Sequence, residues 1–125
     1  MNTIAYFEIQ SSDPARDMRF YETLFGWVFT KEPNLPMEYY RIATNSMNGG
    51  LLKRPADVPP MEKGTNAFTC SIIVEDFDKM SEAILKNGGV VSIPKFAIPG
   101  KCWQGYFIDL DSNQFGIIEV DENAR

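Results

Sequence analysis

The chain repeats one pattern of residues, and this internal repeat limits the folds that it can adopt. Moved forward by 63 positions, Asp13 falls on Asp76, and each of these aspartates stands at the start of a helical pattern. Farther along, the offset becomes 67, which places Gly49 on Gly116 and predicts a four-residue insertion in the second copy. Two copies of one supersecondary unit predict a pseudo-twofold fold, and function in such folds commonly lies where the copies meet.

Each copy reads as a strand, a helix and three further strands. Residues 3–10 alternate apolar and polar side chains, as a half-buried strand does. Asp13 followed by proline predicts a helix start, since a carboxylate accepts unpaired amide protons and proline fits the first helical position; Gly26 predicts its end. Asp76 starts the second helix, which residues 87–89 end. The other predicted strands are 27–30, 38–44 and 47–53 in the first copy, and 68–74, 90–93, 103–110 and 114–120 in the second.

Length and composition predict one domain over residues 1–125, with unit one at about 1–53, a proline-containing linker at about 54–65 and unit two at about 66–125. The net charge of −5 argues against nucleic-acid binding, because it would repel a phosphate backbone. No apolar run is long enough to span a bilayer and the N-terminus lacks the features of a signal peptide, which predicts a cytoplasmic protein without a membrane partner. Cys70 and Cys102 are expected to be thiols, with Cys70 in the core.

Several short motifs carry a resemblance to a known superfamily. They are the aromatic pair 20–21 before the Leu-Phe-Gly-Trp run 24–27, the Lys-Asn-Gly-Gly run 86–89, and the run Asp-Leu-Asp-Ser-Asn-Gln-Phe-Gly at 109–116. Together with the duplication, they make the chain similar to the vicinal oxygen chelate superfamily of glyoxalases, bleomycin resistance proteins and extradiol dioxygenases, and above all to small bacterial glyoxalase-related proteins. The resemblance implies an α+β fold of two pseudo-symmetric βαβββ units, which form an incomplete barrel around a cavity. It also implies a homodimer.

The resemblance places four positions where metal-binding members of the superfamily hold their ion. They are Tyr6, Gly49, Thr69 and Gly116. Glycine has no side chain to donate, neutral tyrosine and threonine are poor ligands, and the chain contains no histidine. Glu8 is the one carboxylate on the matching strand parity, which is too few for a calcium or magnesium site. We therefore predict no metal, no cofactor and no metal-dependent glyoxalase or dioxygenase activity.

Strand alternation predicts which other side chains line the cavity. If Tyr6 and Thr69 point inward, Glu8 and Ser71 do as well. Trp103 follows a turn, which favours a lid over a packed strand residue. The predicted ligand-binding residues are Tyr6, Glu8, Met47, Leu51, Thr69, Ser71, Trp103 and Tyr106.

Each candidate also has a purely structural explanation. Tyr6 fits a core aromatic residue whose hydroxyl meets a backbone group, and this explanation is favoured over a catalytic role. Glu8 fits an ion pair with Arg41 as well as it fits ligand binding.

Three functions remain open from the sequence. The first is metal-free binding of a small organic molecule, since the scaffold is kept while the metal ligands are lost. The second is a metal-independent lyase or isomerase, with Glu8 as base and Tyr6 as acid. The third is a non-catalytic interaction module, in which Met47, Leu51 and tyrosine rings fill the cavity.

Overall fold

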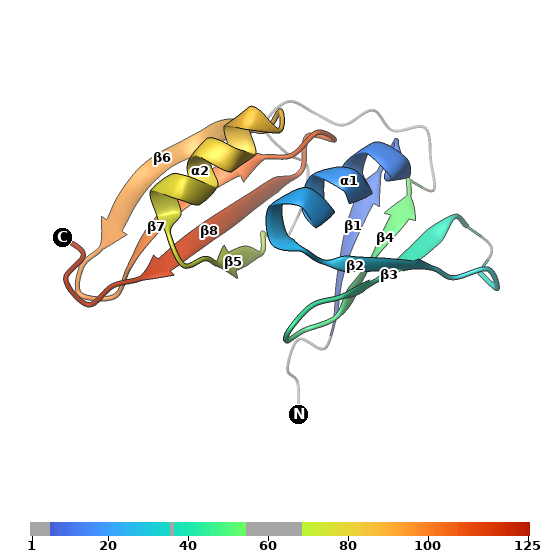
Figure 1. The fold of residues 1–125 in the computed structure, drawn as a ribbon, viewed down its shortest axis with the longest axis horizontal. Coiled ribbons are helices and arrows are strands. Elements are labelled where there is room, and N and C mark those ends of the chain that lie inside the picture. Colours follow the sequence, from blue (N-terminus) through green and yellow to red (C-terminus); the bar gives the residue numbers. More distant parts are fainter. Residues whose placement is uncertain (1–5, 36, 55–68) are drawn as a thin grey trace. The chain divides into compact units, whose positions relative to one another are not determined.

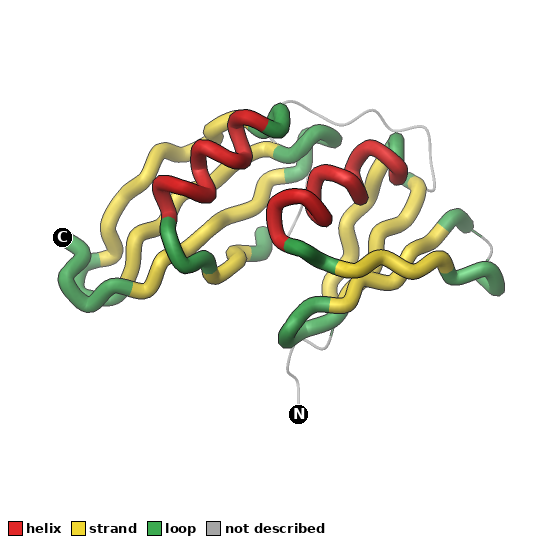
Figure 2. The backbone as a smooth tube through the Cα atoms, viewed as in Figure 1, coloured by secondary structure: helices red, strands yellow, loops and turns green. Residues whose placement is uncertain are grey.

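The computed structural model describes residues 6–35, 37–54 and 69–125, and it contains both predicted helices and eight strands in this part of the chain (Figure 1). The chain divides into two compact units, Met1–Pro59 and Pro60–Arg125. In each unit one helix lies against one four-stranded sheet (Figure 2). Most of the predicted linker and the first five residues lie outside the described residues, and the single-domain organisation stays a prediction.

Unit one follows the order strand, helix and three strands. Its elements are β1 (Phe7–Ser11), α1 (Pro14–Phe25), β2 (Val28–Lys31), β3 (Tyr39–Ala43) and β4 (Gly49–Lys53). The sheet order is β1-β4-β3-β2; β1 runs parallel to β4, and the other neighbours are antiparallel. A parallel pair needs a crossover connection, and the path through α1, β2 and β3 supplies it.

Helix α1 begins and ends where the local signals place it. The Asp13 side chain accepts a hydrogen bond from the amide of Arg16, and Pro14 occupies the first turn. Gly26 ends the helix with a φ of 68°, a left-handed conformation that glycine adopts without strain, and its amide donates to the carbonyl of Glu22. Phe20 and Tyr21 are buried on the sheet side of the helix. The predicted first helix is confirmed.

Unit two repeats this order with longer strands. Its elements are β5 (Ser71–Ile73), α2 (Phe77–Lys86), β6 (Val90–Ile98), β7 (Cys102–Ile108) and β8 (Gln114–Val120), and the sheet order is β5-β8-β7-β6. Asp76 caps α2 by accepting from the amide of Lys79 at 3.0 Å. The core contains Phe77, Ile84, Phe107 and Ile117, each at most 2% exposed. No helix of the described residues is long and apolar enough to cross a membrane.

Two predictions about unit two are wrong. The strand predicted over 90–93 continues to Ile98, because β6 is an edge strand that tolerates Pro94; its pairing with β7 shifts register between Ile93 and Phe96. Cys70 was expected in the core but is exposed just before β5, which begins at Ser71 rather than at residue 68.

Candidate functional site

The sheet of unit one has two chemically different faces. The Phe7 ring lies 5.6 Å from the Trp27 ring, which stacks on Tyr21 of α1, so Phe7 faces the helix. Successive strand residues point to opposite sides, and Glu8 therefore lies on the face away from α1. The pairing aligns Glu8 with Gly50 and Gly50 with Arg41, which continues this row across β1, β4 and β3.

Three side chains form a hydrogen-bonded group on this face, which we call the Tyr39 cluster: Tyr6, Glu8 and Tyr39. The Tyr39 hydroxyl donates to Oε2 of Glu8 at 2.6 Å, and the hydroxyls of Tyr6 and Tyr39 are 2.9 Å apart. A phenol has a single proton, so Tyr6 must be the donor to Tyr39. Tyr39 is 6% exposed, whereas Tyr6 is 38% exposed. The order Tyr6, Tyr39, Glu8 is thus a chain with a buried centre.

The environment of Tyr39 keeps its phenol protonated. Burial makes the largest contribution, and the hydrogen bonds to Glu8 and Tyr6 add to it, so the pKa of Tyr39 is raised well above its usual value of about 10. Tyr39 therefore acts as a fixed donor that orients the Glu8 carboxylate.

Gly50 makes room for this cluster. A Cβ atom at Gly50 would overlap the hydroxyl and the ring of Tyr39, so the phenol lies across β4 only because that residue is glycine. The tyrosine ring thus occupies the space that a side chain from the fourth strand would need.

Unit two holds a neutral counterpart, which we call the Gln104 cluster: Ser71, Gln104 and Tyr106. The pairing aligns Ser71 with Gly116 and Gly116 with Tyr106. Nε2 of Gln104 donates to the Ser71 hydroxyl at 3.2 Å, and the Tyr106 ring stacks on Phe96. A Cβ atom at Gly116 would lie 2.5 Å from the Ser71 hydroxyl and 2.8 Å from Nε2 of Gln104.

These two rows correct the correspondence between the copies. Gly116 pairs with Ser71 on the first strand of its unit, and the glycine that pairs with the matching residue Glu8 is Gly50. Gly49 pairs with Phe7 on the helix side, so the predicted match of Gly49 with Gly116 is wrong by one residue. The offset at this strand is 66, from 50 to 116, rather than 67.

The same shift moves Leu51 to the other face. Leu51 pairs with Ile9, is 0% exposed and belongs to the core below α1, so its predicted position beside Glu8 is wrong. Met47 lies in the connection between β3 and β4 and is 39% exposed.

The remaining predicted residues are in unit two. Thr69 is exposed and precedes β5, while Ser71 and Tyr106 share the face of the Gln104 cluster. Trp103 is a residue of β7, where its indole N–H donates to Asp121 at 3.0 Å and the Lys95 ammonium lies 4.7 Å from its ring. The predicted lid at Trp103 is therefore wrong. Sequence reasoning singled out neither Tyr39 nor Gln104 as a site residue.

The donors on these faces do not fit a transition metal. The Tyr39 cluster offers one carboxylate, one of whose oxygens already accepts a hydrogen bond, and two neutral phenols. The Gln104 cluster offers an amide and two hydroxyls, and the Gly50 and Gly116 positions offer no side chain. Within the described residues, no three His, Cys, Asp or Glu side chains gather as a metal site would require.

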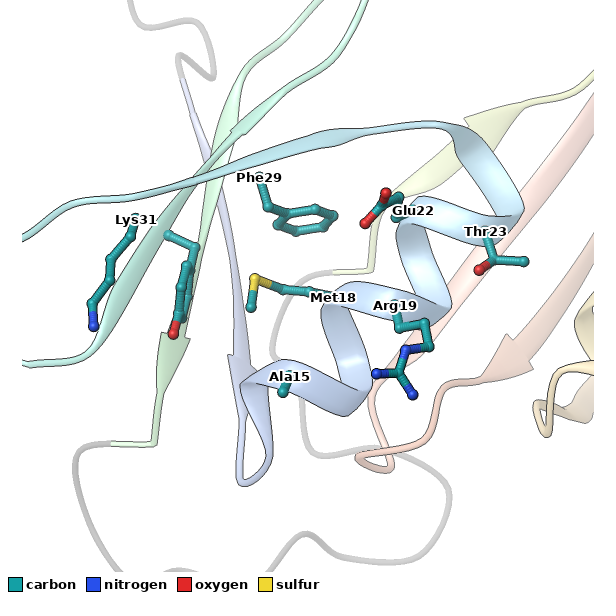
Figure 3. A pocket seen from close by; sticks show the side chains of 8 residues that line it. Ala15, Met18, Arg19, Glu22, Thr23, Phe29 and Lys31 are labelled. Atoms are coloured by element: carbon teal, nitrogen blue, oxygen red, sulfur yellow. The ribbon is translucent and has the colours of Figure 1, made fainter.

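A hollow of about 650 Å³ lies on the opposite side of unit one, between α1 and the hairpin of β2 and β3 (Figure 3). Met18 and Phe29 point toward one another inside it (Figure 3). Its lining residues are Ala15, Met18, Arg19, Glu22, Thr23, Phe29, Lys31 and Tyr40. None of the predicted ligand-binding residues lines this hollow.

Comparisons with known proteins relate the chain to one fold. No protein-family model matches it. A domain from Frankia sp. EAN1pec, described as glyoxylase/bleomycin resistance protein/dioxygenase, superposes with a TM-score of 0.78 at 15% identity and covers 98% of this chain and 94% of that domain. The chain has the fold of this glyoxylase/bleomycin resistance protein/dioxygenase domain. The predicted α+β fold of two βαβββ units is confirmed, and neither sheet closes into a barrel.

Two further matches carry functional names. CFP32 of Mycobacterium tuberculosis and Mycobacterium bovis, named as a proposed glyoxylase, is 30% identical over 97 residues. These residues are 74% of this chain but 36% of CFP32, so the chain spans about a third of that relative. A variant of the fosfomycin resistance protein FosX from Listeria monocytogenes, complexed with Mn(II) and 1S,2S-dihydroxypropylphosphonic acid, superposes with a TM-score of 0.73 at 12% identity, covering 94% and 89% of the two chains.

Proposed function

We propose that this protein binds a small organic molecule without a metal ion, on the sheet faces that carry the Tyr39 and Gln104 clusters. The proposal rests on the side chains that occupy the space above Gly50 and Gly116, where a Cβ atom would otherwise lie. At Gly50 a tyrosine, and at Gly116 an amide and a hydroxyl, occupy the space beside the fourth strand of the unit. Side chains that donate and accept hydrogen bonds there suit an organic ligand better than an ion.

The similar proteins support the binding of a small molecule. The residues of the two clusters distinguish this chain from FosX, whose complex contains a metal ion. FosX is named as complexed with Mn(II) and a phosphonic acid. Manganese prefers oxygen and imidazole ligands in an ordered shell, and the two clusters supply a single carboxylate and no imidazole. The proposal therefore keeps the binding of a small molecule and removes the metal.

The metal-independent lyase or isomerase is the second candidate, and the Tyr6–Tyr39–Glu8 chain bears on it directly. Glu8 as base and Tyr6 as acid are joined through Tyr39, so protons at the two ends of the chain are coupled. Binding without turnover is favoured, because Oε2 of Glu8, the candidate base, already accepts the hydrogen bond of Tyr39.

A homodimer is carried forward as part of the proposal. Edge strand β6 exposes large apolar side chains at Val90, Val91, Ile93, Phe96 and Ile98. Exposed apolar residues on an edge strand are typical of a surface that another chain covers. Sedimentation at micromolar concentration would give the mass of a dimer, and a monomeric mass would contradict this part of the proposal.

Amide NMR of the whole chain against a library of aromatic and heteroaromatic fragments tests the binding function. Saturable shifts are expected for the amides of Gly50 or Gly116, at the clusters. The same fragments should not shift the amide signals of Met18 and Phe29, which line the hollow on the helix side. Shifts confined to that hollow, or no saturable shift at all, would contradict the proposal. Turnover of a bound fragment that is lost in Glu8→Gln would favour the lyase or isomerase.

A further inference from the structure

The distribution of protons in the Tyr39 cluster determines which hydrogen bonds it can offer to a ligand. The cluster has two phenolic protons. The proton of Tyr39 is used on Glu8, and the proton of Tyr6 is used on Tyr39. A carboxylate has no proton to donate. Both hydrogen-bond donors of the cluster are therefore used in bonds within the cluster.

What the cluster presents outward are acceptors. Glu8 is exposed, and within the described part of the chain its second oxygen, Oε1, makes no hydrogen bond. The Tyr6 hydroxyl is partly exposed and keeps a lone pair beyond its bond to Tyr39. Tyr6 and Glu8 both bond the Tyr39 hydroxyl, which brings them within reach of a single polar group of a ligand.

Cationic side chains on the same face are engaged by other partners. Arg41 shares the row of Glu8 and Gly50, but its Nε donates to the Glu32 carboxylate at 2.9 Å. The pKa of Arg41 is raised by that hydrogen bond and ion pair. Arg54 lies 3.4 Å from the Gln10 side-chain oxygen. In the hydrogen bonds of the described residues, neither arginine pairs with the Glu8 carboxylate.

We propose that the unit-one face selects ligands that present hydrogen-bond donors, namely an amidinium, an ammonium or an amide N–H group, and rejects organic carboxylates and phosphonates. This inference rests on the proposed binding function and specifies its ligand class. A charge-assisted hydrogen bond to Glu8 favours the donor group, while an anion would meet a carboxylate and a lone pair. The acceptor-only arrangement follows from Tyr39, which takes the Tyr6 proton and gives its own to Glu8.

Three compounds with one ring and different polar groups test the inference: benzamidine, benzamide and benzoate. Each is titrated into the whole chain while the amide signals of Glu8 and Gly50 are followed by NMR. The expected order of affinity is benzamidine, then benzamide, with benzoate causing no saturable shift of these amides. Glu8→Gln should weaken benzamidine by about 10-fold or more, because the charge-assisted bond is lost.

A matched control lies next to the cluster. Glu38 accepts the Tyr40 hydroxyl at 2.6 Å, as Glu8 accepts that of Tyr39, but the Tyr40–Glu38 bond is exposed and Tyr40 lines the helix-side hollow. Glu38→Gln should therefore leave the affinity for benzamidine unchanged. An equal loss in Glu8→Gln and Glu38→Gln would show a general charge effect and overturn the assignment to Glu8. A folded amide spectrum of Glu8→Gln separates lost recognition from lost structure.

The remaining outcomes separate this inference from the function on which it rests. Benzoate that shifts Gly50 with an affinity equal to that of benzamidine would overturn the donor selectivity and leave metal-free binding in place. If none of the three compounds nor any library fragment shifts Glu8, Gly50 or Gly116, the binding function fails and the inference fails with it.

Discussion

The two sheet faces show how one fold can offer two different chemistries at equivalent positions. In unit one a buried tyrosine lies over Gly50 and holds a carboxylate, whereas in unit two an amide and a hydroxyl converge on Gly116. In each unit the glycine pairs with the polar residue of the first strand. The backbone fixes the position, and the side chain that crosses the glycine decides whether the face is charged or neutral.

The largest expected difference between the units concerns the two glycines. Gly50→Ala should lower the free energy of unfolding by about 2–3 kcal/mol, because the new methyl group overlaps a buried aromatic ring with hydrogen bonds on both sides. Gly116→Ala should cost about 1 kcal/mol, since the Ser71 hydroxyl and the Gln104 amide can turn aside. Urea unfolding measures both. An equal or larger loss in Gly116→Ala would break the comparison.

A smaller effect is expected from the adjacent tyrosines, which sharpen the contrast between a buried and an exposed phenol. Tyr39→Phe removes a part-buried hydrogen bond to a carboxylate and should cost about 1.5 kcal/mol. Tyr40→Phe removes a bond of the same length to Glu38 on the exposed surface and should cost less than about 0.5 kcal/mol. Matching losses in urea unfolding would show that burial of Tyr39 does not strengthen the cluster.

The smallest effect is expected at alkaline pH, where the Tyr39 cluster should lose stability. The pKa of Tyr39 is raised by folding, so the folded phenol still holds its proton when the unfolded phenol releases it above about pH 10. The unfolded state then binds fewer protons, and stability falls as pH rises beyond that value while it is unaffected below.

Urea unfolding between pH 8 and pH 11 tests this dependence against Tyr39→Phe. The variant should lose stability less steeply than the unchanged protein above pH 10. Tyr40, whose pKa is raised chiefly by its hydrogen bond to Glu38, gives the comparison Tyr40→Phe, which should reduce the slope above pH 10 less than Tyr39→Phe does. Parallel curves for the protein and Tyr39→Phe would contradict the shifted pKa of Tyr39.

Local chemistry made much of the fold predictable from the sequence. The helices start after Asp13 and Asp76, whose side chains accept amide protons, and the first helix ends at Gly26, which adopts a left-handed conformation. Strand β8 occupies the predicted range 114–120. The strand that was underestimated, β6, contains Pro94, and proline ends a strand only where its missing amide proton is needed by a neighbour. Whether β6 is an edge strand is a property of the whole sheet.

The candidate site was less predictable, because it depends on strand register. The repeat aligned Gly49 with Gly116, but the connections within the two hairpins differ, and hydrogen bonding places Gly50 beside Glu8. A slip of one residue exchanges the faces of a strand, which is why Leu51 lies in the core. Tyr39 reaches Glu8 across Gly50 from another strand, and a glycine opposite a polar strand residue was the signal available for it.

Manganese titration of the whole chain, followed by paramagnetic broadening of its amide signals, tests the central claim most directly. The claim is that phenol, amide and hydroxyl groups occupy the space beside Gly50 and Gly116, so that these faces recognise an organic molecule rather than an ion. We predict that equimolar Mn²⁺ broadens neither the Gly50 nor the Gly116 amide selectively. Saturable broadening centred on either glycine at equimolar Mn²⁺ would contradict the account.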